Sequence, residues 1–136
     1  MDLFDLSRGE VGEFDLILML RVLHHLSHPA AALERLRELC RAHIVLDVKL
    51  ILQDEPLLYV SLREEGRLNG VGRGLRFRPS RSAVERLLTG SGFMDVKLIP
   101  AKPPLEDEYF KGKRALFTAR VPPSARLRNG AYRGER

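Results

Sequence analysis

The architecture of this chain is most visible in the stretch Phe14-Asp-Leu-Ile-Leu-Met-Leu-Arg-Val-Leu-His-His-Leu-Ser-His-Pro29. Residues 14–20 are apolar apart from Asp15, which predicts a strand covered on both faces, as in the middle of a parallel sheet. A polar turn follows, and Pro29 suits the first turn of a helix, where its missing N–H costs nothing. A strand, a polar turn and a helix in this order predict one wall of a ligand crevice in an open α/β sheet.

The residues after Pro29 predict a helix and then a second strand. Leu33, Leu36 and Leu39 recur at helical spacing, with charged residues between them. The run 43–49, His-Ile-Val-Leu-Asp-Val-Lys, predicts the next strand. A strand, a helix and a strand at this distance form a βαβ unit with a right-handed crossover.

The rest of the chain predicts one more helix and two more strands. In order, we expect an irregular insert (53–79), a helix capped by Ser80 and ended by Gly90 and Gly92, a strand (93–99), a loop (100–113) and a last strand (114–121). The last two strands could pair antiparallel. At the other end, the alternating residues 2–6 could be the end of a further strand.

Length and composition set the broad class of the protein. The 136 residues support one domain with a real core. No apolar run approaches the roughly 20 residues that span a bilayer, and the acidic start Met-Asp-Leu-Phe-Asp is unlike a signal peptide, so we expect a cytoplasmic protein without a membrane partner. Cys40 is the single cysteine, which excludes an internal disulfide and fits a small core residue.

The positive charge is concentrated at the end of the chain. Of the net charge of +5, residues 122–136 carry three units, through four arginines and Glu135. We therefore expect a domain at 1–121 and a basic, disordered tail at 122–136. The tail could contact phosphates or simply be solvated.

The order of the elements and several motifs resemble class I S-adenosylmethionine-dependent methyltransferases over residues 2–121. The resemblance is carried by Phe14-Asp15-Leu16-Ile17-Leu18, Val22-Leu23-His24-His25-Leu26, the helix start His28-Pro29, the run Leu33–Leu39, Pro79-Ser80 with Leu87-Leu88, Gly92-Phe93 and Val96, and Gly112-Lys113-Arg114-Ala115. Within the family, the chain is similar to the branch related to wobble-uridine tRNA methyltransferases and their uncharacterised relatives.

The resemblance implies a partial Rossmann-like α/β sheet. The family has the strand order 3-2-1-4-5-7-6, with S-adenosylmethionine across the carboxyl ends of the strands. With 14–20 as the fourth strand, the chain supplies strands 4-5-7-6 with their flanking helices and, in 2–6, the end of the third. The glycine-rich cofactor turn after the first strand is not encoded here, and 69–74 does not replace it because it follows no apolar strand. We therefore expect a truncated form, the carboxyl-terminal part of such a domain.

The resemblance also implies residues that bind the cofactor. Asp2 and Leu3 match the adenine side, where the acid accepts a hydrogen bond from the exocyclic amine; a frayed terminal residue is the alternative. Leu20 and Arg21 stand at the end of the fourth strand, where family members contact the cofactor. Arg21 could instead reach an anionic substrate or face the solvent.

Three further residues are implied in the acceptor site and its surroundings. His24 matches a position that faces the transferred group and could act as a base near neutral pH, whereas His25 matches a structural hydrogen-bonding residue. Arg114 matches an arginine that, in the wobble-uridine branch, faces an anionic group in the pocket; an exposed turn is the alternative. His24 and His28 are four apart, but no third ligand is evident, so no metal site is predicted.

Two functions remain open at this point. The first is S-adenosylmethionine-dependent methyl transfer to a small molecule or a tRNA base. The second is a non-catalytic remnant that binds a partner, because the free edge of strand 14–20 could pair with a second copy or a complementing chain. A nucleic-acid-binding module would need a basic face that the sequence does not show outside the tail.

Overall fold

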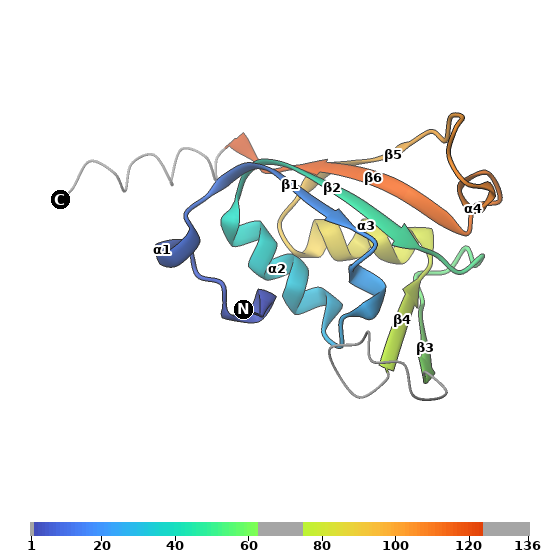
Figure 1. The fold of residues 1–136 in the computed structure, drawn as a ribbon, viewed down its shortest axis with the longest axis horizontal. Coiled ribbons are helices and arrows are strands. Elements are labelled where there is room, and N and C mark those ends of the chain that lie inside the picture. Colours follow the sequence, from blue (N-terminus) through green and yellow to red (C-terminus); the bar gives the residue numbers. More distant parts are fainter. Residues whose placement is uncertain (1, 63–74, 124–136) are drawn as a thin grey trace.

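The computed structural model describes residues 2–62 and 75–123, which form a four-stranded sheet, a two-stranded hairpin and several helices (Figure 1). The elements are η1 (Leu3–Asp5), α1 (Arg8–Val11), β1 (Phe14–Leu20), η2 (Leu23–His25), α2 (Pro29–Leu39), β2 (Cys40–Lys49), β3 (Leu58–Leu62), β4 (Leu75–Pro79), α3 (Arg81–Gly90), β5 (Met94–Ile99), α4 (Asp107–Phe110) and β6 (Arg114–Arg120). The basic segment 124–136 and the glycine-containing segment 69–74 lie outside the described residues.

The strand order of the main sheet is β1-β2-β6-β5. Strands β1 and β2 are parallel and are joined through α2, whereas β6 is antiparallel to both of its neighbours. This is the order 4-5-7-6 expected for the carboxyl-terminal half of a methyltransferase sheet. The predicted fold class, a partial Rossmann-like α/β sheet with flanking helices, is confirmed.

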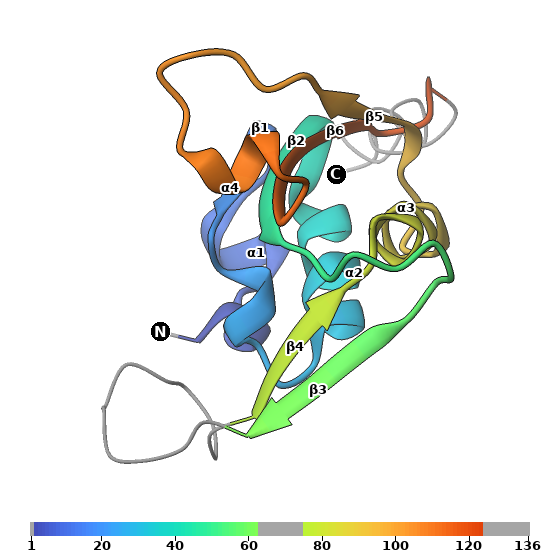
Figure 2. The same cartoon turned by 90° about the vertical axis from the view of Figure 1, so that its right-hand side faces the viewer.

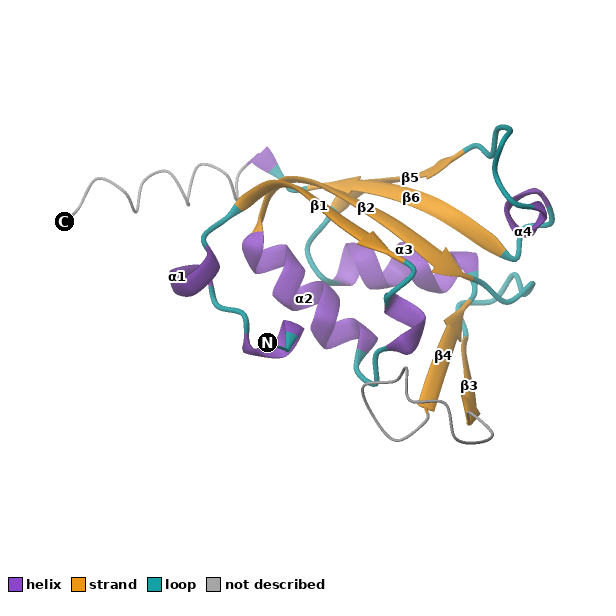
Figure 3. Ribbon diagram, viewed as in Figure 1, coloured by secondary structure: helices purple, strands orange, loops and turns teal. Residues whose placement is uncertain are grey.

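The hydrophobic core lies between the sheet and the helices α2 and α3, which are on the same face of the sheet (Figure 3). Helix α2 begins at Pro29, as predicted, and buries Leu33, Leu36 and Leu39 at helical spacing. From the sheet, Ile44, Leu46 and Phe117 complete this core, and Cys40 is fully buried beside them.

The opposite face of β1 is open, which corrects the prediction that both faces of this strand are covered. Phe14, Leu16, Leu18 and Leu20 are each between 45% and 57% exposed, whereas Met19, which points toward the helices, is buried. Strand β1 is at the edge of the sheet and pairs with β2 alone among the described strands. An apolar run in the sequence indicates that a strand can be buried. Whether both of its faces are buried depends on the other segments that pack against it.

Two other local predictions are wrong. Residues 2–6 form the short helical turn η1 and not the end of a strand, because Asp2 caps this turn by accepting a hydrogen bond from the Phe4 N–H at 3.3 Å. Within the insert 53–79, β3 and β4 pair antiparallel, with Tyr59 opposite Arg78. The hairpin projects on the helix side of the sheet, as Figure 2 shows.

Ser80 joins this hairpin to α3. Its hydroxyl accepts hydrogen bonds from the Ala83 N–H at 3.2 Å, as the predicted helix cap, and from the Leu57 N–H at 3.1 Å. It also donates one to the Glu55 carbonyl at 2.6 Å. The side chain is fully buried, and the Ala83 N–H depends on it, whereas the Leu57 N–H also bonds to the Glu55 carbonyl at 2.9 Å.

Ser80→Ala is expected to lower the free energy of unfolding by about 1–2 kcal/mol, because it removes a helix cap and leaves the buried Ala83 N–H without its acceptor. Urea unfolding followed by circular dichroism measures the change. Ser82→Ala is the control, since the Ser82 hydroxyl makes a single backbone bond, to Asp54, in an exposed position. Equal losses in the two variants would contradict this role of Ser80.

Candidate functional site

Charged side chains gather at the edge of the sheet where β1 and β2 end. Arg21 directly follows β1. Asp47 and Lys49 are among the last residues of β2, and Arg114, the first residue of β6, pairs with Lys49. Because β1 and β2 are parallel and β6 is antiparallel to β2, two carboxyl ends and one amino end meet at this edge. Helix α4 and its loop lie at the same end of the sheet (Figure 3).

Asp47 is the centre of this cluster. Its side chain is almost fully buried, with the residue 5% exposed, and its Oδ2 accepts a hydrogen bond from the Tyr109 hydroxyl at 2.8 Å. The Arg21 Nε lies 3.5 Å from Oδ2, and the Arg114 Nη1 lies 3.7 Å from Oδ1. The Asp47 backbone carbonyl also accepts from the Arg21 N–H at 3.0 Å. Asp47 therefore links β1, β6 and α4.

The segment between β5 and β6 supplies the other acids. Glu106 Oε1 accepts from Arg21 Nη2 at 2.9 Å, and this hydrogen bond is the main cause of the raised pKa of Arg21. Glu108 accepts from Arg114 Nε at 3.1 Å and lies 3.4 Å from Lys49 Nζ, and the Arg114 bond is the main cause of the lowered pKa of Glu108. Three cations and three carboxylates thus balance each other at this edge.

Arg21 has an uncommon backbone for a residue with a side chain. Its φ is 59°, in the left-handed region that non-glycine residues rarely adopt. The bond from its N–H to the Asp47 carbonyl holds this conformation at the end of β1. The turn directs the chain from β1 into η2, where His24 lies.

His24 is buried, with 7% of its surface exposed, and its Nδ1 has no hydrogen-bond partner among the described residues. Burial lowers the pKa of His24 to about 4, and the charges of His25, Arg114, Lys49 and Arg76 act in the same direction. The imidazole is therefore neutral near pH 7. It can accept a proton, but it is a weaker base than an ordinary histidine.

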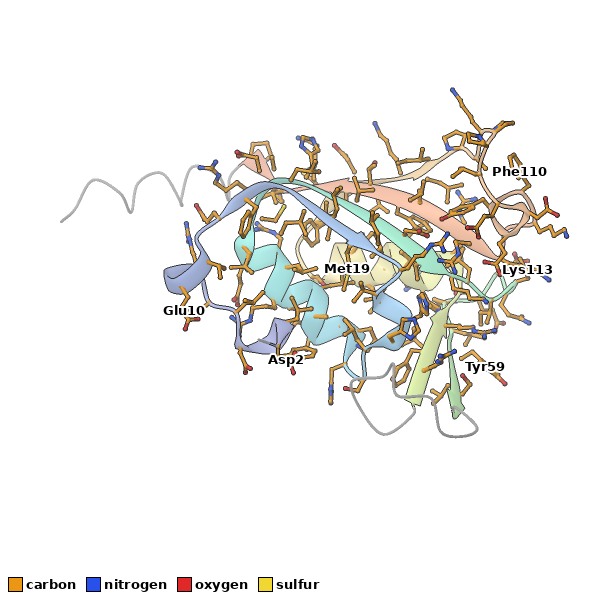
Figure 4. All side chains as sticks on the ribbon, viewed as in Figure 1. Asp2, Glu10, Met19, Tyr59, Phe110 and Lys113 are labelled. Carbon is orange, nitrogen blue, oxygen red and sulfur yellow. The ribbon has the colours of Figure 1, made fainter. Side chains whose placement is uncertain are left out.

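The sequence-predicted site residues fall into two groups. Arg21 and Arg114 meet through Asp47, and His24 lies close enough to feel the charge of Arg114. Leu20, the neighbour of Arg21 in sequence, presents its side chain on the open face of β1. Asp2 and Leu3 are elsewhere: η1 packs against α2, and Figure 4 shows Asp2 far from Lys113 and Phe110 at the α4 end.

Asp47, Glu106, Glu108 and Tyr109 were missed by the sequence reasoning. Asp47 left one signal, an acid inside the otherwise apolar strand segment 44–48. The acids of the 100–113 loop left none, because an acidic loop is ordinarily a solvated one. Within 2–62 and 75–123, no group of three or more His, Cys, Asp or Glu side chains is arranged to hold a metal ion.

Comparison with known proteins was informative only at the level of structure. No family model matches the sequence, and no curated protein matches it. The N-terminal domain of EvdMO1, solved with SAH and D-fucose, superimposes with a TM-score of 0.63 at 15% identity over 90% of this chain and 53% of that one. The chain has a partial methyltransferase fold.

Two structures of methyltransferases support this fold assignment. The 1,6-didemethyltoxoflavin-N1-methyltransferase of Burkholderia thailandensis matches with a TM-score of 0.57 at 19% identity, over 89% of this chain and 48% of that one. Human N-acetylserotonin methyltransferase matches with a TM-score of 0.57 at 20% identity, over 89% of this chain and 32% of that one. The chain thus spans about half the length of the EvdMO1 domain and less of the other two.

None of the described helices is long and apolar enough to cross a membrane.

Proposed function

We propose that this chain is part of a unit that transfers a methyl group from S-adenosylmethionine to a small molecule. The observation that carries the proposal is the charged cluster at the carboxyl edge of a sheet with the strand order of a methyltransferase. In open α/β sheets, ligands bind outside the carboxyl ends of the strands. The similar structures also support the cofactor, since those of EvdMO1 and of the toxoflavin enzyme contain SAH and that of the human enzyme contains SAM.

The cofactor, when bound, supplies an electrophilic methyl group on a sulfonium. This chain is proposed to contribute one wall of the cofactor site and the charged side chains on that wall. Leu20 offers an exposed apolar side chain at the end of β1. The half-exposed Arg21 guanidinium stands beside it and is already oriented by Asp47 and Glu106. These two residues are proposed as cofactor contacts, and Asp2 and Leu3, at η1, stay proposed for the adenine side.

His24 is proposed as the general base that takes a proton from the molecule to be methylated. Its Nδ1 is buried without a partner, which leaves one ring nitrogen free for a bound molecule. Its low pKa means that the neutral, proton-accepting form is present throughout the physiological pH range. Arg114 is proposed as a substrate-binding residue, although its guanidinium is already paired with Glu108 and Asp47.

The second part of the proposal concerns the chemical class of the methyl acceptor. The toxoflavin and serotonin enzymes are named for small-molecule acceptors, which favours a small molecule here. The similarity in sequence motifs to the wobble-uridine branch favours a tRNA base instead. Methylation assays with radiolabelled cofactor separate the two, because label would appear either in the small-molecule extract or in precipitable RNA.

Isothermal titration calorimetry with SAH tests the cofactor part. We expect micromolar binding, weakened about tenfold in Arg21→Ala through loss of one charged contact. Arg35→Ala is the control, because Arg35 pairs with Glu38 on α2, away from the carboxyl edge. Undetectable binding by this chain, alone and together with a polypeptide that supplies the glycine-rich first half of the fold, would overturn the proposal.

A second candidate function rests on the open face of β1. An apolar edge strand with unpaired backbone groups is a template for pairing with another strand. In this function the chain is a non-catalytic module that binds a second copy of itself or a complementing chain through residues 14–20. The exposure of alternate apolar side chains along the whole strand is the observation that favours it.

Leu18→Lys is expected to weaken such association about tenfold or more, because a charge would be buried at the centre of the contact. Sedimentation velocity at increasing concentration measures self-association, and the same experiment with a first-half polypeptide measures complementation. Phe110→Lys, at a similarly exposed position on α4, is the control. Association that is the same in the wild type and in Leu18→Lys would exclude β1 as the contact.

A further inference from the structure

A second potential binding site lies next to the charged cluster, with which it shares Tyr109 and Arg114. It is a cavity of about 360 Å³, bounded by the segment 50–54 after β2, the start of α3, the end of β5 and the loop that leads to β6. This volume is within the range of small-molecule sites in proteins, roughly 300–1,000 Å³. Tyr109 and Arg114 form the wall between the cavity and Asp47.

Exposed apolar side chains collect around this cavity. Leu52, Leu98 and Ile99 are 64%, 37% and 38% exposed, and all three line it together with the buried Leu50. They come from two segments that are distant in sequence. An apolar lining that water now contacts would be stabilised by an apolar ligand, since burial of such surface is the main source of binding free energy.

The wall that the cavity shares with the charged cluster contains the Arg114 guanidinium. Arg114 is 7% exposed, and its Nη1 is buried and ion-paired with Asp47 Oδ1 at 3.7 Å. Its guanidinium also lies over the Tyr109 ring, 6.0 Å from the centroid, which limits the positions it can adopt. The guanidinium is therefore held by groups of the protein itself, and the cavity offers a ligand mainly apolar surface.

The charge of the ligand follows from the partners of Arg114. Glu108 and Asp47 already neutralise this guanidinium, and Glu106 does the same for Arg21. An anion would have to displace Glu108 or leave a carboxylate without its cation, which costs free energy in a partly buried cluster. A neutral ligand avoids this cost.

We propose that this cavity holds the apolar part of the methyl acceptor, an uncharged aromatic or aliphatic molecule. The assignment to the methyl acceptor rests on the proposed function above. The cavity itself does not: it is a binding site for such molecules whether or not methyl transfer takes place.

Acetophenone and benzoate are the probes, since they share a ring and differ in charge. Their dissociation constants are measured by ligand-observed NMR titration on the whole chain. Wild type should bind acetophenone at least about threefold more tightly than benzoate, and Ala101→Trp, which fills the cavity, should weaken acetophenone roughly tenfold. Ala31→Trp on the exposed side of α2 is the matched control and should change nothing.

The outcomes distinguish the cavity proposal from the proposed methyl transfer. Circular dichroism and thermal melting establish that Ala101→Trp is folded, and Ile99→Trp repeats the test from the β5 side. Equal acetophenone binding in the wild type and in both filled variants, or tighter binding of benzoate, overturns the cavity proposal. SAH binding in the same samples decides the proposed function independently: SAH binding without acetophenone binding leaves methyl transfer standing, and the reverse leaves only the cavity.

Discussion

Asp47→Ala is expected to lower the free energy of unfolding by about 3–5 kcal/mol, the usual cost of removing one partner from a buried ion pair. The variant deprives the Tyr109 hydroxyl of its acceptor and leaves the buried Arg114 with Glu108 alone. It also frees Arg21 from one of its two carboxylates. Urea unfolding, followed by circular dichroism, measures the shift in midpoint at constant slope.

Two variants show whether burial causes this loss. Asp15→Ala also removes a carboxylate from an arginine, Arg41, at 2.8 Å, but the Asp15 side chain is 72% exposed, so less than about 1 kcal/mol should be lost. Asp47→Asn keeps an acceptor for Tyr109 and should fall between the two. A loss in Asp47→Ala no larger than that in Asp15→Ala would show that Asp47 does not hold the carboxyl edge together.

Acidification is expected to destabilise the protein through His24. Burial lowers the pKa of His24 from the ordinary 6.5 to about 4, so the unfolded chain binds a proton in this range before the folded one does. The stabilising contribution of the neutral ring is present above about pH 6.5 and is lost progressively as the pH falls toward 4. The full shift corresponds to roughly 3 kcal/mol.

His24→Phe isolates the effect of His24 protonation, because phenylalanine places an aromatic ring at this position that cannot be protonated. The difference in unfolding free energy between wild type and variant should change by about 2–3 kcal/mol between pH 7 and pH 4. The exposed His43 gives the control variant, His43→Asn, whose stability should follow that of the wild type. Parallel pH profiles for wild type and His24→Phe would mean that His24 is not buried in its neutral form.

Asp47 and His24, the residues of these two predictions, also lie in the proposed site. The Nδ1 of His24 is buried without a hydrogen bond among the described residues, and it lies in the same region as the ion pair of Asp47 Oδ1 and Arg114 Nη1. Native proteins leave few such atoms, so this nitrogen favours a ligand or an ordered water beside it. A bound acceptor should therefore raise the melting temperature, and Asp47→Asn should reduce that increase.

Local patterns were sufficient for much of the fold. Pro29 and the leucines of α2, the cap at Ser80 and the apolar segments of β1, β2 and β6 depend on neighbours within a few residues, and all are found where they were predicted. The strand order 4-5-7-6 was also predicted, through the resemblance to a known family. The η1 turn was not, because a capping aspartate and a strand end look alike over five residues.

What the sequence established was therefore a set of elements and their pairing, since periodicity and caps act over short distances along the chain. It also placed Arg21, His24 and Arg114 among the candidates. The folded chain alone revealed the charged cluster, because Tyr109 reaches Asp47 across 62 positions of sequence and Glu106 reaches Arg21 across 85. It alone showed the open face of β1 and the cavity beside Arg114, since exposure and enclosed volume depend on which distant segments meet, and no local pattern of residues encodes that.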